Sequence, residues 1–510
     1  MTHASEISTR GRAWSLPPAA VLILVLAMSL DAQAQTDAKP TPARPNFLFL
    51  FADDLTHRAI RVSGNPDVET PRIDRLAARG LRYTHAHIQG GLNGAVCIAS
   101  RAMLMTGRGL WRCGPGGNGT RPDGSLYPLW GRTLGDAGYR TYAVGKWHNG
   151  KVALANSFHT HSETILGGML ASTSTEGAAY HRPAPGNPWR PDDPSWKGHW
   201  RTVDGKVDHS SERWADAAIG HLREAAGLDR PFFLSVAFHA PHDPRQAPRA
   251  DLDRYREDRL TLPKNLAPKH SFDLGEFSTR DELLTPYPRT EEAVRMHLRE
   301  YYAIISHLDT QIGRILDELD RLGLTDETVV IFAGDNGLAV GEHGLIGKQS
   351  LYDHSIRVPL ILAGPGIPRG ATNDRLVTIA SLFSTTCRLA GIPTPESVQF
   401  PPLDLAAASV GGKDSDEAIH AAYMNKQRMI RTHQWKLIES PVASRIQLFA
   451  IRDDPWEMND LAGDPSKQLL IDWLHARLKE WCRSSDDPMS SDELDATLAE
   501  HRRVLGRPMR

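Results

Sequence analysis

Four short apolar runs, separated by stretches with helical character, constrain the fold of this chain more than any other feature. The runs cover residues 46–51, 140–144, 231–238 and 328–333. Runs of this kind are typical of strands that are buried on both faces. Residues 72–79 and 291–322 have helical patterns, the second with apolar residues spaced along one helix face. Strands that alternate with helices predict an α/β fold in which a large, mostly parallel sheet is covered by helices on both faces.

Polar residues follow each of the four runs, at the point where the predicted strand ends. They are Asp53 and Asp54, Lys146 and His148, His239 and His242, and Asp335 and Asn336. Because the carboxyl ends of parallel strands lie at one edge of a sheet, we expect these side chains to converge there. That edge is the predicted functional site.

The carboxylates in this set suggest a metal site. Two adjacent carboxylates, Asp53 and Asp54, repel each other unless a cation or a strong donor compensates them. Together with Asp335 and Asn336 they offer hard oxygen ligands, which suit Ca²⁺ or Mg²⁺ better than zinc. Taken alone, each pair could equally form an ordinary turn.

The first residues have the features of a targeting segment. Arg10 and Arg12 precede an apolar run over residues 19–30, and small residues at 32–34 offer a cleavage site. A membrane anchor is the alternative, but the run is shorter than the ~20 residues that span a bilayer. We therefore expect a signal peptide, export to the periplasm or the extracellular space, and no membrane span after cleavage.

Composition narrows the function further. The 59 basic residues nearly balance the 61 acidic ones, so nothing points to nucleic acid, and an anionic substrate would be bound by local basic clusters. The four cysteines, Cys97, Cys113, Cys387 and Cys482, are too few for a disulfide-stapled scaffold. If Cys97 is chemically modified, at most one pair is left, and the sequence leaves its identity open.

Cys97 opens the most specific motif in the chain, Cys97-Ile98-Ala99-Ser100-Arg101, which Thr106-Gly107-Arg108 follows closely. This motif resembles the signature of the formylglycine-dependent sulfatases of the alkaline phosphatase superfamily. The resemblance implies that a maturation enzyme oxidises Cys97 to formylglycine, whose hydrated form is the nucleophile. It also implies an alkaline-phosphatase-like fold and a Ca²⁺ ion, with Mg²⁺ as the less favoured alternative.

Further motifs extend the resemblance and assign roles. They are Gly145-Lys146-Trp147-His148, Pro241-His242, Gly347-Lys348, and Asp454-Pro455-Trp456-Glu457 near the C-terminus. The resemblance implies that Arg101, Lys146 and Lys348 bind the sulfate. It makes His148 the base and His242 the acid of the reaction. It assigns Asp53, Asp54, Asp335 and Asn336, together with the modified Cys97, to the metal.

The chain also departs from the family pattern at three positions. Ala99 replaces the commoner proline, and Asp353 and His354 stand where many members have Glu and Gly. His354, like His239, is therefore a candidate for contact with substrate, with a structural role as the alternative.

The domain boundaries follow from changes in composition along the chain. Residues 1–34 are the predicted signal peptide, 35–45 a flexible leader, 46–401 the catalytic sulfatase domain, and 402–510 a C-terminal α+β subdomain with a short antiparallel sheet. Residues near 156–208 and 243–288, rich in Pro and polar residues, are expected to leave the sheet as long excursions. Tryptophans in the first excursion could stack on sugar rings or pin the loop to the body.

These features favour a hydrolase that removes sulfate from a sulfated carbohydrate. Two alternatives remain open. One is a phosphonate monoester or phosphodiester hydrolase of the same superfamily, and the other is a non-catalytic protein that binds sulfated glycans.

Overall fold

The computed structural model describes residues 44–114, 122–170, 181–406 and 417–505, so the predicted signal peptide and almost all of the leader lie outside the described residues. The main sheet has eight strands in the order β11-β2-β10-β9-β1-β8-β4-β5. Their bounds are β1 (Asn46–Asp53), β2 (Leu81–His87), β4 (Arg140–Lys146), β5 (Thr160–Ile165), β8 (Phe232–Pro241), β9 (Thr328–Gly334), β10 (Arg357–Ala363) and β11 (Ala371–Thr378). Only β10 runs against the other seven, which confirms the predicted, mostly parallel sheet.

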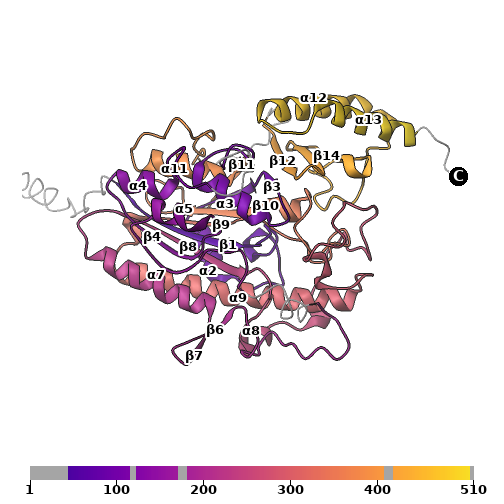
Figure 1. Ribbon diagram of the computed structural model, residues 1–510. Helices are drawn as coiled ribbons and strands as arrows, with labels where there is room; N and C mark the ends of the chain where they lie inside the picture. The colour runs from indigo at the N-terminus through magenta and orange to yellow at the C-terminus, as the bar shows by residue number, and fades with distance from the viewer. Residues whose placement is uncertain (1–43, 115–121, 171–180, 407–416, 506–510) are drawn as a thin grey trace, which may run out of the picture. The chain divides into compact units, whose positions relative to one another are not determined.

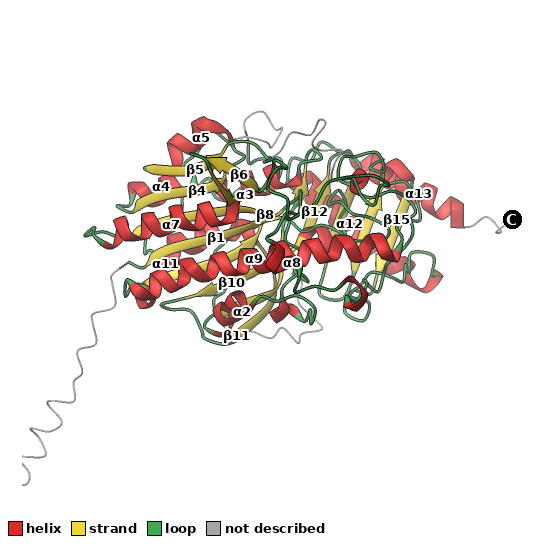
Figure 2. Cartoon of the chain, turned by 90° about the horizontal axis from the view of Figure 1, so that it is seen from below, coloured by secondary structure: helices red, strands yellow, loops and turns green. Residues whose placement is uncertain are grey.

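Strand β1 shows how the two faces of this sheet are covered. Phe47, Phe49 and Phe51 belong to one hydrophobic core, and the alternating residues Leu48 and Leu50 belong to the other. The first core packs against α3 (Val96–Thr106), α4 (Trp130–Asp136), α5 (Gly150–Ser157) and α11 (Leu382–Leu389). The second packs against α2 (Pro71–Ala78), α7 (Ser210–Ala226) and α9 (Glu291–Arg321). Helices therefore lie on both sides of the strands, as Figures 1 and 2 show.

A second sheet has five strands in the order β15-β14-β13-β12-β3. Its strands are β3 (Gly90–Gly91), β12 (Ile419–Tyr423), β13 (Gln427–Arg431), β14 (Lys436–Ser440) and β15 (Arg445–Phe449), and it packs against α12 (Gln468–Ser484) and α13 (Ser491–Leu505). Strands β12 to β15 pair antiparallel, which confirms the small antiparallel sheet. Strand β3 comes from the first part of the chain, so residues 402–510 do not build this sheet alone, and the boundary at residue 401 stays a prediction.

The remaining elements are short. They are β6 (Trp200–Val203), β7 (Lys206–His209), α8 (Arg249–Leu252), α10 (Asp353–Ile356) and 3₁₀ turns at Arg61–Ser63, Glu257–Arg259, Glu282–Leu284, Thr325–Glu327, Ile379–Ser381, Pro441–Ala443 and Pro465–Lys467. The predicted excursion over 156–208 is wrong for Thr160–Ile165, which forms the edge strand β5 of the main sheet. This strand is polar and only half-buried, so no apolar run marked it.

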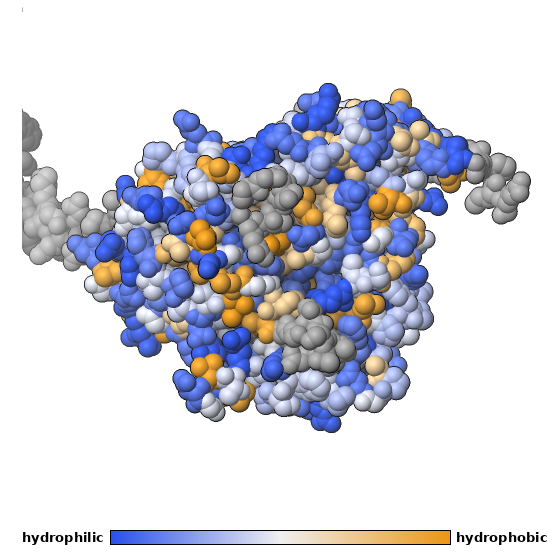
Figure 3. Space-filling model, viewed as in Figure 1, coloured by the Kyte–Doolittle hydropathy of each residue, from blue (hydrophilic) through white to orange (hydrophobic). Residues whose placement is uncertain are grey.

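The surface agrees with the balanced charge of the chain. On the face shown in Figure 3, hydrophobic residues occur in small groups among hydrophilic ones. None of the helices in the described ranges combines the length and the apolar character that a membrane crossing requires. None of the four cysteines, all of which are described, forms a disulfide.

Candidate active site

The carboxyl edge of the main sheet gathers polar side chains from four adjacent strands. Asp53 and Lys146 end β1 and β4, and Asp335 directly follows β9. His239 lies near the end of β8, just before His242, and β9, β1, β8 and β4 are neighbours in that order. The structure therefore brings together the residues that were expected to converge at the strand ends.

Cys97 lies in the first turn of α3, a helix whose eleven residues are all buried. Its Sγ is 3.4 Å from His148 Nδ1 and 3.5 Å from Lys146 Nζ. Burial raises the pKa of the thiol, and the opposing effect of Lys146 does not cancel this. A protonated thiol is a weak nucleophile. The Sγ atom thus stands in for the oxygens that a formylglycine at this position would carry.

Two buried ion pairs flank Cys97. Lys146 Nζ lies 2.5 Å from Asp53 Oδ2, and Arg101 Nε donates to Asp335 Oδ2 at 2.8 Å. A second guanidinium nitrogen of Arg101 donates to the carbonyl oxygen of Lys146 at 2.7 Å. Because α3 and β4 are tied together through Arg101, the two cations hold fixed positions beside the sulfur.

Asp54 forms the centre of a second buried group. Lys348 Nζ lies 2.6 and 2.9 Å from its two carboxylate oxygens, and Asn336 Nδ2 donates to Oδ1 at 2.8 Å. His242 Nε2 lies 3.5 Å from Oδ2. Burial alone would raise the pKa of Asp54, but His242 and Lys348 outweigh this effect and lower it. Asp54 is therefore ionised at neutral pH.

The oxygen atoms at this edge fit a hard divalent cation. Burial, and then the charge of Asp335, raises the pKa of Asp53 well above its usual range, and the opposing charges of Lys146 and Arg101 do not cancel this effect. Asp53 Oδ1 and Asn336 Oδ1 are buried and have no hydrogen-bond partner among the described residues. Ligand atoms of Asp53, Cys97 and Asp335 lie within 4.8 Å of one another. Uncompensated oxygens of this type are the ligands that Ca²⁺ and Mg²⁺ prefer.

The backbone is strained at two of these residues. Asp54 (φ 61°) and His148 (φ 67°) adopt the left-handed conformation that non-glycine residues rarely take. Such strain costs about 1–3 kcal/mol per residue and persists only where the surroundings impose it. Both residues lie directly after strands whose registers are fixed within the sheet, so the sheet can hold them in place.

Residues from the two long excursions position His242 through hydrogen bonds and an ion pair. The sequence analysis did not predict this role for them. His242 Nδ1 donates to the carbonyl oxygen of Asp243 at 2.8 Å, and His199 Nε2 donates to the carbonyl oxygen of His242 at 3.0 Å. The Arg280 guanidinium pairs with both carboxylate oxygens of Asp243. No local pattern marks these residues, because Arg280 and His199 are each more than thirty positions from the residues they contact.

The two candidate substrate histidines differ in their surroundings. His239 is buried against Trp214, with ring centroids 5.0 Å apart, and neither of its ring nitrogens has a partner among the described residues. Burial, followed by Lys146, lowers its pKa well below the usual range, so it lies close to the cationic cluster. His354 instead hydrogen-bonds to Ser355 and lies among the rings of Tyr352 and His343. These contacts favour His239, although both assignments stay predictions.

The tryptophans of the first excursion hold that loop against the body. Trp189 is buried in a cluster with Leu284 and Ile346, and Trp200 Nε1 donates to the carbonyl oxygen of Pro191 at 3.1 Å. These contacts favour the pinning role over stacking on sugar.

A mostly parallel α/β sheet with buried cations and carboxylates at its carboxyl edge is consistent with an enzyme that acts on an anionic substrate. The family model for sulfatases matches residues 45–392, and the model for the C-terminal part of N-sulphoglucosamine sulphohydrolase matches residues 341–484. The first match covers more than half of the chain, which therefore belongs to the sulfatase family of sulfuric ester hydrolases. The predicted family and enzyme class are confirmed.

Curated relatives span most of the chain. Choline-sulfatase of Rhizobium meliloti is 28% identical over 456 residues, 83% of this chain and 84% of the relative. N-acetylglucosamine-6-O-sulfatase of Bacteroides thetaiotaomicron is 25% identical over 500 residues, 84% and 82% of the two chains. Iduronate 2-sulfatase of Homo sapiens is 27% identical over 433 residues, 72% of each chain.

Solved structures share the fold. One, described as bound to its substrate D-glucosamine-2-N,6-O-disulfate, has a TM-score of 0.66 at 23% identity and covers 88% of this chain and 99% of its own. Phosphonate monoester hydrolase from Silicibacter pomeroyi also has a TM-score of 0.66, at 19% identity over 87% and 96% of the two chains. The alkaline-phosphatase-like fold is thereby confirmed.

Proposed function

We propose that this enzyme removes sulfate from sulfated carbohydrates, such as fragments of polysaccharide or glycosaminoglycan. The observation that carries the proposal is the position of Cys97 Sγ within 3.5 Å of both Lys146 Nζ and His148 Nδ1, beside buried carboxylates. A protein that only binds sulfated glycans needs cations but no such nucleophile and base. Relatives named for N-acetylglucosamine-6-O-sulfate and iduronate 2-sulfate support a carbohydrate substrate. Export to the periplasm or beyond, through the signal peptide at residues 1–34, is part of the proposal.

A modified residue 97 and a divalent cation complete the proposed site. A maturation enzyme would convert Cys97 to formylglycine, which, when hydrated, supplies one hydroxyl to attack sulfur and a second through which sulfate is released. A Ca²⁺ ion, or less favourably Mg²⁺, would be held by Asp53, Asp54, Asp335 and Asn336 with residue 97, and would polarise a sulfate oxygen.

His148 is the proposed base. Burial, and then the charge of Lys146, lowers the pKa of His148 to about 2, so its ring is neutral at physiological pH. A neutral imidazole 3.4 Å from the position of Sγ can accept a proton from a hydroxyl carried there.

Three cations are proposed to bind the sulfate, namely Arg101, Lys146 and Lys348. Burial alone would lower the pKa of Lys348, but Asp54 outweighs this and holds the pKa well above its usual range. Lys348 therefore remains charged when it faces an anion. Arg101 stays charged at any working pH and presents donors in a fixed plane.

His242 is the proposed acid that protonates the leaving ester oxygen. Its Nδ1 is committed to the carbonyl oxygen of Asp243, so Nε2 is the atom that faces the site. Burial lowers the pKa of His242 and outweighs Asp54, which lies 3.5 Å from Nε2 and favours the protonated ring. When protonated, the ring would be a stronger acid than an ordinary imidazolium and could release the Nε2 proton to the departing oxygen.

A substrate panel tests the proposal. The purified enzyme is assayed for sulfate release from defined sulfated mono- and oligosaccharides, and for turnover of an aryl sulfate, the matched aryl phosphate and a phosphonate monoester. We expect the highest kcat/KM on a sulfated sugar. Faster turnover of the phosphonate would favour the phosphonate monoester hydrolase alternative, and binding without turnover of any ester would favour the glycan-binding alternative.

Mass spectrometry of the peptide that contains Cys97 tests the modification separately. We expect an aldehyde in place of the thiol, whereas the peptide with Cys113 provides the unmodified control. A fully active preparation in which residue 97 is entirely thiol would refute the proposed nucleophile.

A further inference from the structure

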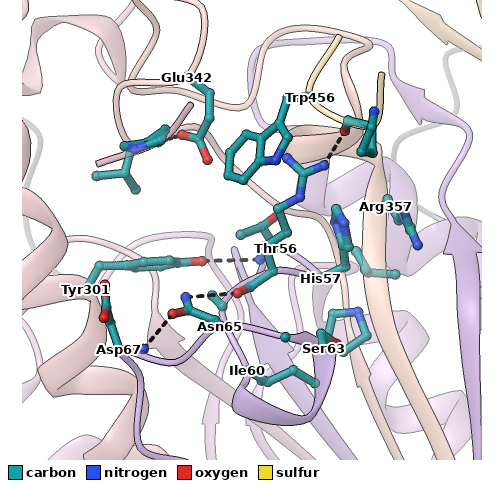
Figure 4. Close-up of a pocket in the computed structure, with 18 of the residues that line it drawn as sticks. Thr56, His57, Ile60, Ser63, Asn65, Asp67, Tyr301, Glu342, Arg357 and Trp456 are labelled. Atoms are coloured by element: carbon teal, nitrogen blue, oxygen red, sulfur yellow. Dashed lines mark hydrogen bonds between the residues drawn. The ribbon is translucent and has the colours of Figure 1, made fainter. Parts of the chain in front are cut away.

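A second cavity, distinct from the proposed catalytic cluster, lies between the segment after β1, strand β2, helix α9 and the loop that contains Trp456 (Figure 4). Its volume is about 490 Å³, within the range of roughly 300–1,000 Å³ that is usual for small-molecule sites. None of the residues proposed for catalysis or metal binding lines it. Tyr301 connects the cavity wall to the site, because its hydroxyl donates to the carbonyl oxygen of Asp54 and accepts from Thr56 N.

Two buried polar side chains in the wall have unused hydrogen-bonding atoms. Thr56 Oγ1 and His57 Nδ1 have no partner among the described residues, although the two residues are only 5% and 7% exposed.

The uncompensated charge of the cavity is positive. Arg82 is half-buried and Lys264 is exposed, and within the described ranges neither forms an ion pair or a hydrogen bond. Of the two acidic residues of the wall, Asp67 accepts from Thr261 N at 2.7 Å and Glu342 accepts from Val340 N at 2.5 Å. The wall has four basic side chains, Arg58, Arg82, Lys264 and Arg357, against these two carboxylates, so its charge favours an anion over a cation.

The rest of the wall is largely aromatic and aliphatic. Tyr302 and Leu298 from α9 face the cavity together with Pro359 and Trp456, and Arg58 stacks on the Trp456 ring at 3.8 Å. Figure 4 shows Trp456 and Tyr301 on the sides of the cavity away from His57 and Arg357. A simple inorganic ion would leave this apolar surface unfilled.

We propose that this cavity binds an organic anion with a flat apolar body. Arg82 and Lys264 pair with its acidic group, and its body packs against Tyr302 and Trp456. This site is additional to the proposed sulfatase activity and shares no residue with it.

Binding of 2-naphthalenesulfonate to the full-length enzyme, measured by isothermal titration calorimetry, tests the proposal. The carbon–sulfur bond of this probe is not a sulfate ester and offers the enzyme nothing to hydrolyse. We expect Arg82→Leu to weaken binding at least about tenfold while kcat/KM on a small aryl sulfate stays unchanged. Lys264→Leu, at an exposed position that folding does not need, should weaken binding in the same direction.

Two further variants separate this site from the catalytic one. Lys348→Met removes a proposed sulfate-binding cation and should leave the affinity for the probe intact. Lys151→Leu removes an exposed cation outside the cavity and should change nothing. The proposal would be overturned if Lys348→Met lost binding of the probe. It would also be overturned if both cavity variants bound the probe as tightly as the wild type, or if the wild type did not bind it.

Discussion

Asp54 makes more than one of the contacts on which the proposed site depends. Its carboxylate meets Lys348, Asn336 and His242, and its backbone is left-handed. We predict that Asp54→Asn, which tolerates this backbone and removes only the charge, lowers kcat by at least about 100-fold. Stability falls by about 3–5 kcal/mol as well, because Lys348 becomes a buried cation without a counterion. Sulfate release and urea unfolding measure the two effects.

A double variant separates the two effects. Asp54→Asn combined with Lys348→Met removes the unpaired charge and should recover most of the stability but none of the activity. Turnover that survives both the single substitution and chelation of divalent cations would contradict the proposed role of Asp54 as a metal ligand.

Arg280 is a positioning residue that acts through Asp243 on His242. We predict that Arg280→Ala lowers kcat by about 10- to 100-fold with little change in KM, because small displacements of a reacting group are costly. Arg280→Lys should restore part of the activity, since it keeps the charge beside Asp243 but loses the two-pronged geometry. A rise in KM without a fall in kcat would instead assign Arg280 to substrate binding. Arg223→Ala, an exposed arginine on α7 paired with Glu318, is the control and should keep wild-type kinetics.

At the scale of elements, His475 joins three pieces of the C-terminal region. From α12 its Nδ1 lies 2.7 Å from Glu439 of β14, and its Nε2 lies 2.9 Å from Asp495 of α13. Burial alone would lower the pKa of His475, but Glu439 and Asp495 outweigh it and raise the pKa. The stabilisation from protonated His475 is fully present below the pKa of a histidine in the unfolded chain, which is about 6.5. It is lost as the pH rises through the higher pKa that His475 has in the folded protein.

We therefore predict that the wild type loses more stability between pH 6 and pH 9 than His475→Gln does, as measured by thermal unfolding at both pH values. His433→Gln is the matched control. Burial lowers the pKa of His433, so this ring opposes folding below the unfolded pKa of about 6.5, and its replacement should not diminish the loss of stability between pH 6 and pH 9. Equal losses in the wild type and in His475→Gln would refute the assignment.

At the scale of the whole described unit, a buried charge network links the two sheets. Lys436 of β14 lies 2.9 Å from Asp353 and 2.6 Å from Glu457, and Asp353 begins α10, which leads into β10 of the main sheet. We predict that Lys436→Met destabilises the protein by about 3–5 kcal/mol, because two buried carboxylates lose their shared cation. Equilibrium unfolding in urea measures the change.

Lys206, an exposed residue that pairs with Asp208, provides the control for this experiment. Lys206→Met should have little effect on stability, because exposed ion pairs are weak. If the two variants unfolded at the same urea concentration, the network would not contribute to the joining of the sheets.

Asp353 and His354, which both depart from the family pattern, have different surroundings in the structure. Asp353 accepts from Lys436 and also lies near Arg431 and Arg357, so it has a clear structural role. His354 has no contact that explains a substrate role. The sequence shows that both residues differ from those of many family members. Only the surrounding structure shows that Asp353 forms ion pairs, whereas His354 is a buried ring.

The positions of four buried strands, the residues at their carboxyl ends and the family could all be predicted from the amino-acid sequence. This is possible because apolar runs and short motifs are local patterns, and parallel strands place their ends at one edge whatever loops join them. Tertiary structure alone decided the polar edge strand β5, the two-residue strand β3, the support of His242 by His199 and Arg280, and the second cavity. Each of these depends on contacts between residues far apart in the chain, and no local pattern encodes such contacts.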